Sequence, residues 1–173
     1  MSSGAFRAAT ILCPGPSLAE AISTLQSLSS DAPFFGINRA VEAVECDYWI
    51  AIDHKTFDEV TPKGTPAIIT TLETAKKIDR NVLRAYRSKP VPDHLPPVGT
   101  GWANFSTLLG ITTAYDLGFN RIVLYGADMN GVNDWDGKQS SRVNRTETRW
   151  QKEHRQYSRL VTWMQSKGVE VTR

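Results

Sequence analysis

Four polar clusters follow short apolar runs of the chain, which is where a parallel sheet places its ligands. In open parallel sheets, ligands bind beyond the carboxyl ends of the strands, near the point where the strand order reverses. The clusters are Gly15-Pro16-Ser17 after residues 8–13, Asn38 after 33–37, Asp53-His54 after 48–52 and Asp128 after 121–125. Their positions predict one shared site along one edge of a sheet.

The Gly15-Pro16-Ser17 turn has the composition of an anion site. Gly15 lets a ligand approach the backbone, and Pro16 restricts the turn. Ser17 caps the following helix while free N–H groups face an anion such as phosphate. The simpler interpretation of the same residues is a helix start with a serine cap.

Strands alternate with helices along the whole chain. Apolar runs predict strands at 8–13, 33–37, 48–52, 66–70, 82–86, 121–125 and 169–172. Helical spacing predicts long helices at 17–28, 100–117 and 149–167, with short helical pieces at 39–44 and 73–78. This order predicts an α/β, Rossmann-like fold with a mostly parallel sheet and helices on both faces.

The composition is that of one globular domain covering residues 1–173. Hydrophobic residues make up 40% and charged residues 22%, close to globular averages. The net charge of +2 is too small to indicate duplex nucleic acid by itself. We expect a cytoplasmic protein, because no apolar run is long enough for a membrane span and Met1–Arg7 lacks the core of a signal peptide. Cys13 and Cys46 are not expected to form a structural disulfide.

The order and spacing of the clusters resemble the sialyltransferase-like glycosyltransferases of bacteria. The residues that carry the resemblance are CPGPSL at 13–18, INRA at 37–40 and TGWANFSTLLGITTAYDLGFNRIVLYGADMN at 100–130. It covers most of the chain. The resemblance implies that a CMP-type nucleotide sugar lies across the strand ends and is transferred to a hydroxyl-bearing acceptor. It also implies metal-independent transfer with a histidine as general base and no further cofactor.

The resemblance assigns roles to individual residues. It makes the Gly15, Pro16 and Ser17 turn the nucleotide site and Asn38 a donor contact. Thr100 and Gly101 correspond to a loop that contacts the base through its backbone, and Asp128 corresponds to the strand-end aspartate. The chain departs from the pattern at Pro14, where the family commonly has an asparagine that touches the nucleotide.

Two histidines are candidates for the general base. His154 lies near the start of the last predicted helix, where the family places its histidine, and His54 directly follows Asp53 at a strand end. Imidazole titrates near neutral pH, as proton removal from a hydroxyl requires. The alternatives are an exposed helical histidine beside Glu153 and a polar loop residue.

The stretch from Lys138 to Arg159 is the most basic part of the chain. We predict a short basic lid at about residues 129–149, whose arginines close over the donor phosphate. These arginines are Arg142, Arg145 and Arg149. A solvated face explains the same charges. Trp135 and Trp150 would allow base stacking on a nucleic acid, a partner that we do not favour.

Two other functions fit the same pattern. The same resemblance extends to a related group of proteins with this turn, the pterin pyrophosphokinases, which transfer pyrophosphate from ATP with magnesium. Asp53 and Asp128, expected at adjacent strand ends, would then be the magnesium ligands. The third possibility is a nucleotide- or nucleic-acid-binding module without chemistry, built on the basic stretch.

Overall fold

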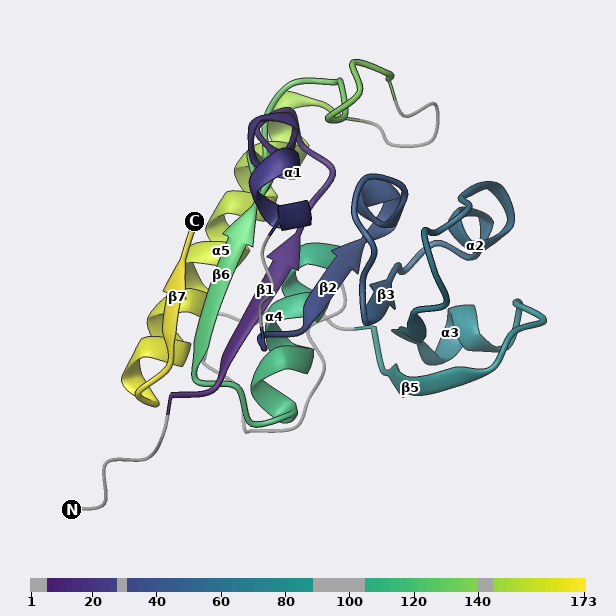
Figure 1. Ribbon diagram of the computed structural model, residues 1–173. Helices are drawn as coiled ribbons and strands as arrows, with labels where there is room; N and C mark the ends of the chain where they lie inside the picture. Colours follow the sequence, from purple (N-terminus) through teal and green to yellow (C-terminus); the bar gives the residue numbers. More distant parts are fainter. Residues whose placement is uncertain (1–5, 28–30, 89–104, 140–144) are drawn as a thin grey trace.

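The computed structural model describes residues 6–27, 31–88, 105–139 and 145–173, and its centre is a sheet of seven parallel strands (Figure 1). The strands are β1 (Ala8–Leu12), β2 (Phe34–Ile37), β3 (Tyr48–Ile50), β4 (Ala67–Thr71), β5 (Val82–Tyr86), β6 (Arg121–Tyr125) and β7 (Glu170–Thr172).

The strand order is β5-β4-β3-β2-β1-β6-β7, so the direction of growth reverses beside β1. Ile11 of β1 pairs with Phe35 of β2 on one side and with Leu124 of β6 on the other. The loops after β1, β2 and β6 therefore meet at the same edge of the sheet, which is where parallel sheets bind ligands.

Helices cover both faces of the sheet (Figure 1). On one face lie α4 (Ser106–Asp116) and α5 (Glu147–Ser166), and on the other lie α1 (Leu18–Ser27), the 3₁₀ helix η1 (Asn38–Glu42) and α2 (His54–Glu59). The short helix α3 (Leu72–Ala75) connects β4 to β5. The fold class predicted from the sequence is confirmed, and the sheet is parallel throughout.

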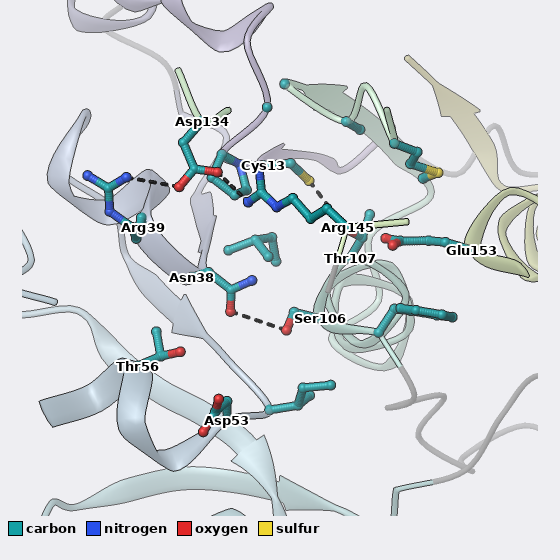
Figure 2. A pocket seen from close by; sticks show the side chains of 18 of the residues that line it. Cys13, Asn38, Arg39, Asp53, Thr56, Ser106, Thr107, Asp134, Arg145 and Glu153 are labelled. Atoms are coloured by element: carbon teal, nitrogen blue, oxygen red, sulfur yellow. Dashed lines mark hydrogen bonds and ion pairs between the residues drawn. The ribbon is translucent and has the colours of Figure 1, made fainter. Parts of the chain in front are cut away.

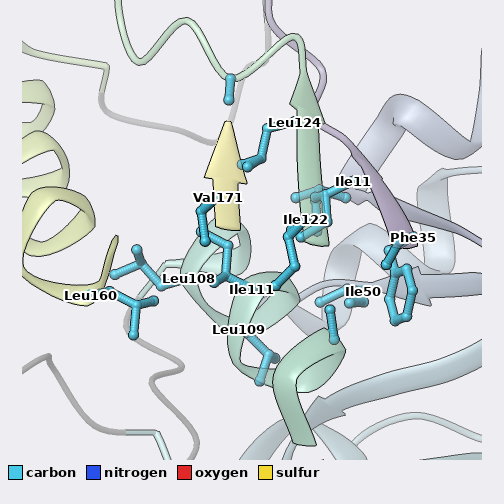
Figure 3. Packing of buried hydrophobic residues seen from close by; sticks show 14 of the residues in the cluster. Ile11, Phe35, Ile50, Leu108, Leu109, Ile111, Ile122, Leu124, Leu160 and Val171 are labelled. Carbon is cyan, nitrogen blue, oxygen red and sulfur yellow. The ribbon is translucent and has the colours of Figure 1, made fainter. Parts of the chain in front are cut away.

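The core consists of two apolar layers because successive strand residues point to opposite faces. Ile11 belongs to the layer under α4 and α5, whereas Leu12 belongs to the layer under α1. Ile50 and Trp49 divide between the layers in the same way. Figure 3 shows the larger layer, in which side chains of α4, α5 and β7 meet those of the central strands.

Two of the long helices begin two or more residues away from the predicted start. The helix expected to begin at Thr100 begins at Ser106, because Phe105 has the extended backbone of an N-cap (φ −133°, ψ 142°). The last helix begins at Glu147, two residues before the predicted start, because the Thr146 side chain caps it by accepting from the Arg149 N–H. Apolar periodicity does not mark the start of α5, since its first turn follows a polar cap.

Both cysteines are free and buried, as expected. Within the part of the chain that the structure describes, no helix has the length and apolar character needed to cross a bilayer.

Candidate functional site

A cavity of about 310 Å³ opens at the carboxyl edge of the sheet, over β1, β2, β3 and β6. Its walls come from the loops after these strands, from the start of α4 and from the start of α5 (Figure 2). The charged side chains that line it are Arg39, Asp53, Glu59, Asp134, Arg145, Arg149 and Glu153. A cavity with convergent charged groups at this place in the fold is the best candidate for a functional site.

Backbone strain is concentrated in the same cavity. Among the described residues, two non-glycine residues have left-handed φ angles, Asn38 at 49° and Met129 at 50°, and both line it. Such conformations cost free energy and cluster at functional sites. Asn38 is held from two sides, since its Oδ1 accepts from Oγ of Ser106 at 3.2 Å and its carbonyl accepts from Nε1 of Trp49 at 3.1 Å.

The turn Gly15-Pro16-Ser17 donates hydrogen bonds to the loop after β6, so part of it is not free to bind a ligand. The N–H of Gly15 donates to the carbonyl of Gly126 at 2.9 Å, and the N–H of Ser17 donates to Oδ2 of Asp128 at 3.0 Å. A Cβ atom on Gly15 would lie 2.3 Å from that same carboxylate oxygen. The glycine is therefore needed for the close approach of two loops, and a protein carboxylate occupies the start of α1.

Only some of the residues that the sequence predicts to contact the nucleotide line this cavity. Gly15 and Asn38 line it, whereas Ser17 and Asp128 line a second, more open hollow beside β6 and β7. Pro16 lines neither of them. Thr100, Gly101 and Arg142 lie outside the described residues.

A chain of ion pairs crosses one side of the cavity (Figure 2). Arg39 donates to Asp134 at 2.9 Å, to Asp136 at 2.7 Å and to Glu42 at 2.9 Å. The second oxygen of Asp134 accepts from Nη2 of Arg145. The Asp134 side chain is only 1% exposed, and both of its oxygens are held by arginines. The Arg39 guanidinium also holds the pKa of the Asp136 carboxyl well below its usual range.

Arg145 and Arg149 each keep a donor without a partner. The Nε atoms of both are buried and have no hydrogen-bond acceptor among the described residues. The start of α4 adjoins them, and its N-cap residue Phe105 offers no side-chain acceptor to the first turn. Unpaired buried donors and an uncapped helix N-terminus both favour a negatively charged group.

Glu153 is a second buried acid of the cavity, beside Asp134. It is 6% exposed, and this burial raises its pKa, although the positive charges of Arg149 and Arg145 and the hydroxyl of Thr107 oppose the shift. A carboxyl group with a raised pKa can exchange a proton closer to neutral pH than an ordinary glutamate. Figure 2 shows Glu153 reaching from α5 toward Thr107 at the start of α4.

Cys13 lies beside these groups but remains a thiol. Its Sγ is 3.7 Å from Oγ1 of Thr107, and burial raises its pKa to about 12. A thiol of this pKa supplies almost no thiolate at neutral pH.

Neither of the two candidate histidines lines the cavity. His154 is half-buried on α5 and follows directly after Glu153 in sequence. His54 is the first residue of α2, with Nδ1 3.7 Å from Oδ1 of Asp53. Only its neighbour Asp53 reaches the cavity wall.

The two aspartates expected to share a magnesium ion follow strands that are not neighbours in the sheet. Asp53 follows β3 and Asp128 follows β6, with β2 and β1 between them. Three strand spacings are about 14 Å, and the two residues line different hollows. The expectation that they end adjacent strands is therefore wrong. Among the described residues, no cluster of three or more His, Cys, Asp or Glu side chains is placed to hold a metal.

The two tryptophans considered for base stacking lie in different places. Trp135 packs against the apolar layer under α1. Trp150 lines the cavity, with the Arg145 guanidinium 6.0 Å from its ring centre and its own Nε1 donating to the carbonyl of Gly131.

Sequence reasoning missed Glu153 and Asp134 as site residues. Glu153 stands in the same helical face as Arg149 and Trp150, a spacing that the sequence does contain. Asp134 lies in a segment without periodicity, and nothing in the sequence distinguishes it from Asp136.

Comparisons with protein-family models, curated proteins and solved structures found no match to this chain.

Proposed function

We propose that the protein is a glycosyltransferase that moves a sugar from a CMP-type nucleotide donor to an acceptor hydroxyl. The reaction would take place in the cavity above β1, β2, β3 and β6. The observation that supports it most is that one cavity holds a buried glutamate with a raised pKa together with two arginines that keep unpaired donors. Proton removal and charge stabilisation are the two tasks that this transfer requires.

In the proposed step, Glu153 is the general base. Its carboxylate takes the proton of the acceptor hydroxyl while that oxygen forms a bond to the anomeric carbon of the sugar. The bond from this carbon to the phosphate oxygen breaks, and the electron pair leaves with CMP. We prefer Glu153 to His154 because Glu153 lines the cavity.

Arg145 and Arg149 would stabilise the departing nucleotide. The phosphate gains negative charge as the glycosidic bond breaks, and positively charged side chains next to it lower the barrier. The left-handed Asn38 fits the donor contact implied by the resemblance, since it lies in the same cavity. Trp150 offers a ring on which the base can stack.

The test compares two neighbouring residues of α5 in a transfer assay with CMP sugars. We expect Glu153→Gln to lower turnover at least about 100-fold, the scale of general base catalysis, while CMP affinity changes little. The variant His154→Ala tests the base expected from the sequence. Loss of turnover in His154→Ala alone would return the role to that histidine, and full turnover in both variants would contradict a base at this position.

A further inference from the structure

We propose that Asp134 is a positioning residue that orients Arg145 toward the anionic group of the bound ligand, with Arg39 as its anchor. The inference rests on the proposed function in taking the cavity as the ligand site. It adds a residue that acts through Arg145 rather than on the ligand. It also explains why Arg39, one of the three described arginines that line the cavity, is not available to bind.

First, every nitrogen of the Arg39 guanidinium donates to an acid of the protein. Its Nε, Nη1 and Nη2 atoms donate to Glu42, Asp134 and Asp136 at 2.7 to 2.9 Å. These contacts raise the pKa of the guanidinium further above its ordinary value, with Asp136 as the largest cause. Arg39 therefore joins η1 to the loop after β6 and has its charge neutralised by acids of the protein.

The second step is the orientation of Arg145. Its Nη2 donates to Oδ1 of Asp134, and its Nη1 donates to the carbonyl of Val132 at 3.1 Å. Because Arg39 holds Oδ2 of the same carboxylate, Asp134 cannot turn away from Arg145. Both terminal nitrogens of Arg145 are thus fixed by contacts with the protein, and Nε is the nitrogen of this guanidinium that has no partner.

Third, the unpaired Nε atoms of Arg145 and Arg149 favour a negatively charged ligand group. The Arg145 side chain is only 9% exposed, and a donor buried to that degree without an acceptor is costly. Arg149 has an unpaired Nε in the same wall, next to the first turn of α4. An oxyanion held there would accept from both arginines. Phosphate of a nucleotide and carboxylate of an acidic sugar share this chemistry.

The experiment measures ligand binding by calorimetry on the full chain, with four probes. These are inorganic phosphate, CMP, cytidine and free N-acetylneuraminate. We expect Asp134→Asn to weaken phosphate and CMP binding about tenfold or more, as for loss of one hydrogen bond to a charged group. Cytidine binding should not change, because cytidine has no anionic group. A loss confined to N-acetylneuraminate would identify the sugar carboxylate, rather than phosphate, as the oriented anion.

Asp136→Asn is the matched control, because Asp136 pairs with Arg39 and not with Arg145. It should change phosphate affinity by less than about twofold. A double-mutant cycle adds the decisive comparison: in an Arg145→Gln background, Asp134→Asn should have no further effect on phosphate binding. Equal losses in Asp134→Asn and Asp136→Asn, an equal loss of cytidine binding, or an undiminished effect in that background would overturn the proposal.

A second variant covers the case in which Asp134→Asn does not fold. Arg145→Lys keeps the charge but has no donor at the position of Nε, so phosphate affinity should again fall about tenfold. Unchanged affinity would count against the orientation of Arg145. Phosphate binding needs no turnover, so its dependence on Asp134 can hold even if no sugar nucleotide is used. Conversely, the protein could transfer the sugar while its phosphate affinity does not depend on Asp134. That result would support the glycosyltransferase function and contradict the role proposed for Asp134.

Discussion

At the scale of the residue, the choice between Glu153 and His154 is decided by one step along a helix. Successive residues of an α-helix are turned by about 100°, so neighbours in sequence face different surroundings. Glu153 shares a face with Arg149 and Trp150 and reaches the cavity, while His154 does not line it. Burial then gives this glutamate a raised pKa, which an exposed glutamate would lack.

The raised pKa predicts how stability depends on pH. Between the ordinary glutamate pKa of about 4.3 and the higher folded value, the folded protein binds more protons at Glu153 than the unfolded chain. The contribution of this group is therefore complete at low pH and is lost as the pH rises through the folded pKa. Glu153→Gln removes the titration, so the variant should melt at a higher temperature than the wild type at pH 8.

The same melting experiment at pH 4 is the control, because the protonated carboxyl and the amide are both neutral. The difference between the two proteins should nearly vanish there. A variant that is less stable than the wild type at pH 8 would mean that the attraction of Arg149 and Arg145 outweighs burial at Glu153.

At the scale of the element, the start of α1 depends on a residue more than 100 positions away. The sequence favoured Ser17 as the cap, but the Ser17 N–H donates to the Asp128 carboxylate. A carboxylate at this position also interacts favourably with the helix dipole. The turn thus already holds an anion, which is why we place the ligand anion at the start of α4.

If Asp128 rather than Ser17 caps α1, the two alanine variants should differ in their free energy of unfolding. Asp128→Ala should lower the free energy of unfolding by about 1 kcal/mol, the usual cost of losing a helix cap. Ser17→Ala should cost clearly less, within about 0.5 kcal/mol. Urea denaturation of both variants measures the difference. A larger cost for Ser17→Ala would restore the serine cap.

At the scale of the whole molecule, the sheet order decides which polar clusters can act together. The ends of β1, β2 and β3 contribute to one cavity with the loop after β6. This arrangement supports a donor that extends across several strand ends, and it separates the two aspartates of the magnesium hypothesis.

A thermal-shift screen tests the ligand of that cavity. The ligands are CMP, CDP, UDP, GDP and ATP, each with and without magnesium. A ligand that binds only the folded protein raises the melting temperature by mass action. We expect CMP without metal to raise it by about 5 °C or more at about 100 times its Kd. Selective stabilisation by ATP with magnesium would favour the pyrophosphokinase alternative instead.

The sequence by itself determined the α/β class, the order of its elements and the edge at which polar residues gather. These features follow from local patterns, since a buried parallel strand is an unbroken apolar run and turns carry glycine and proline. Asp53 and Asn38 were found in this way, and both line the cavity.

Only the tertiary structure decided which of these polar residues share a site. The pairing of β1 with β6 brings Asp128 to Ser17, and the folding of an aperiodic segment brings Asp134 between Arg39 and Arg145. Such contacts join residues far apart in sequence. The burial that raises the pKa of Glu153 likewise depends on helices packing together, which no local spacing records.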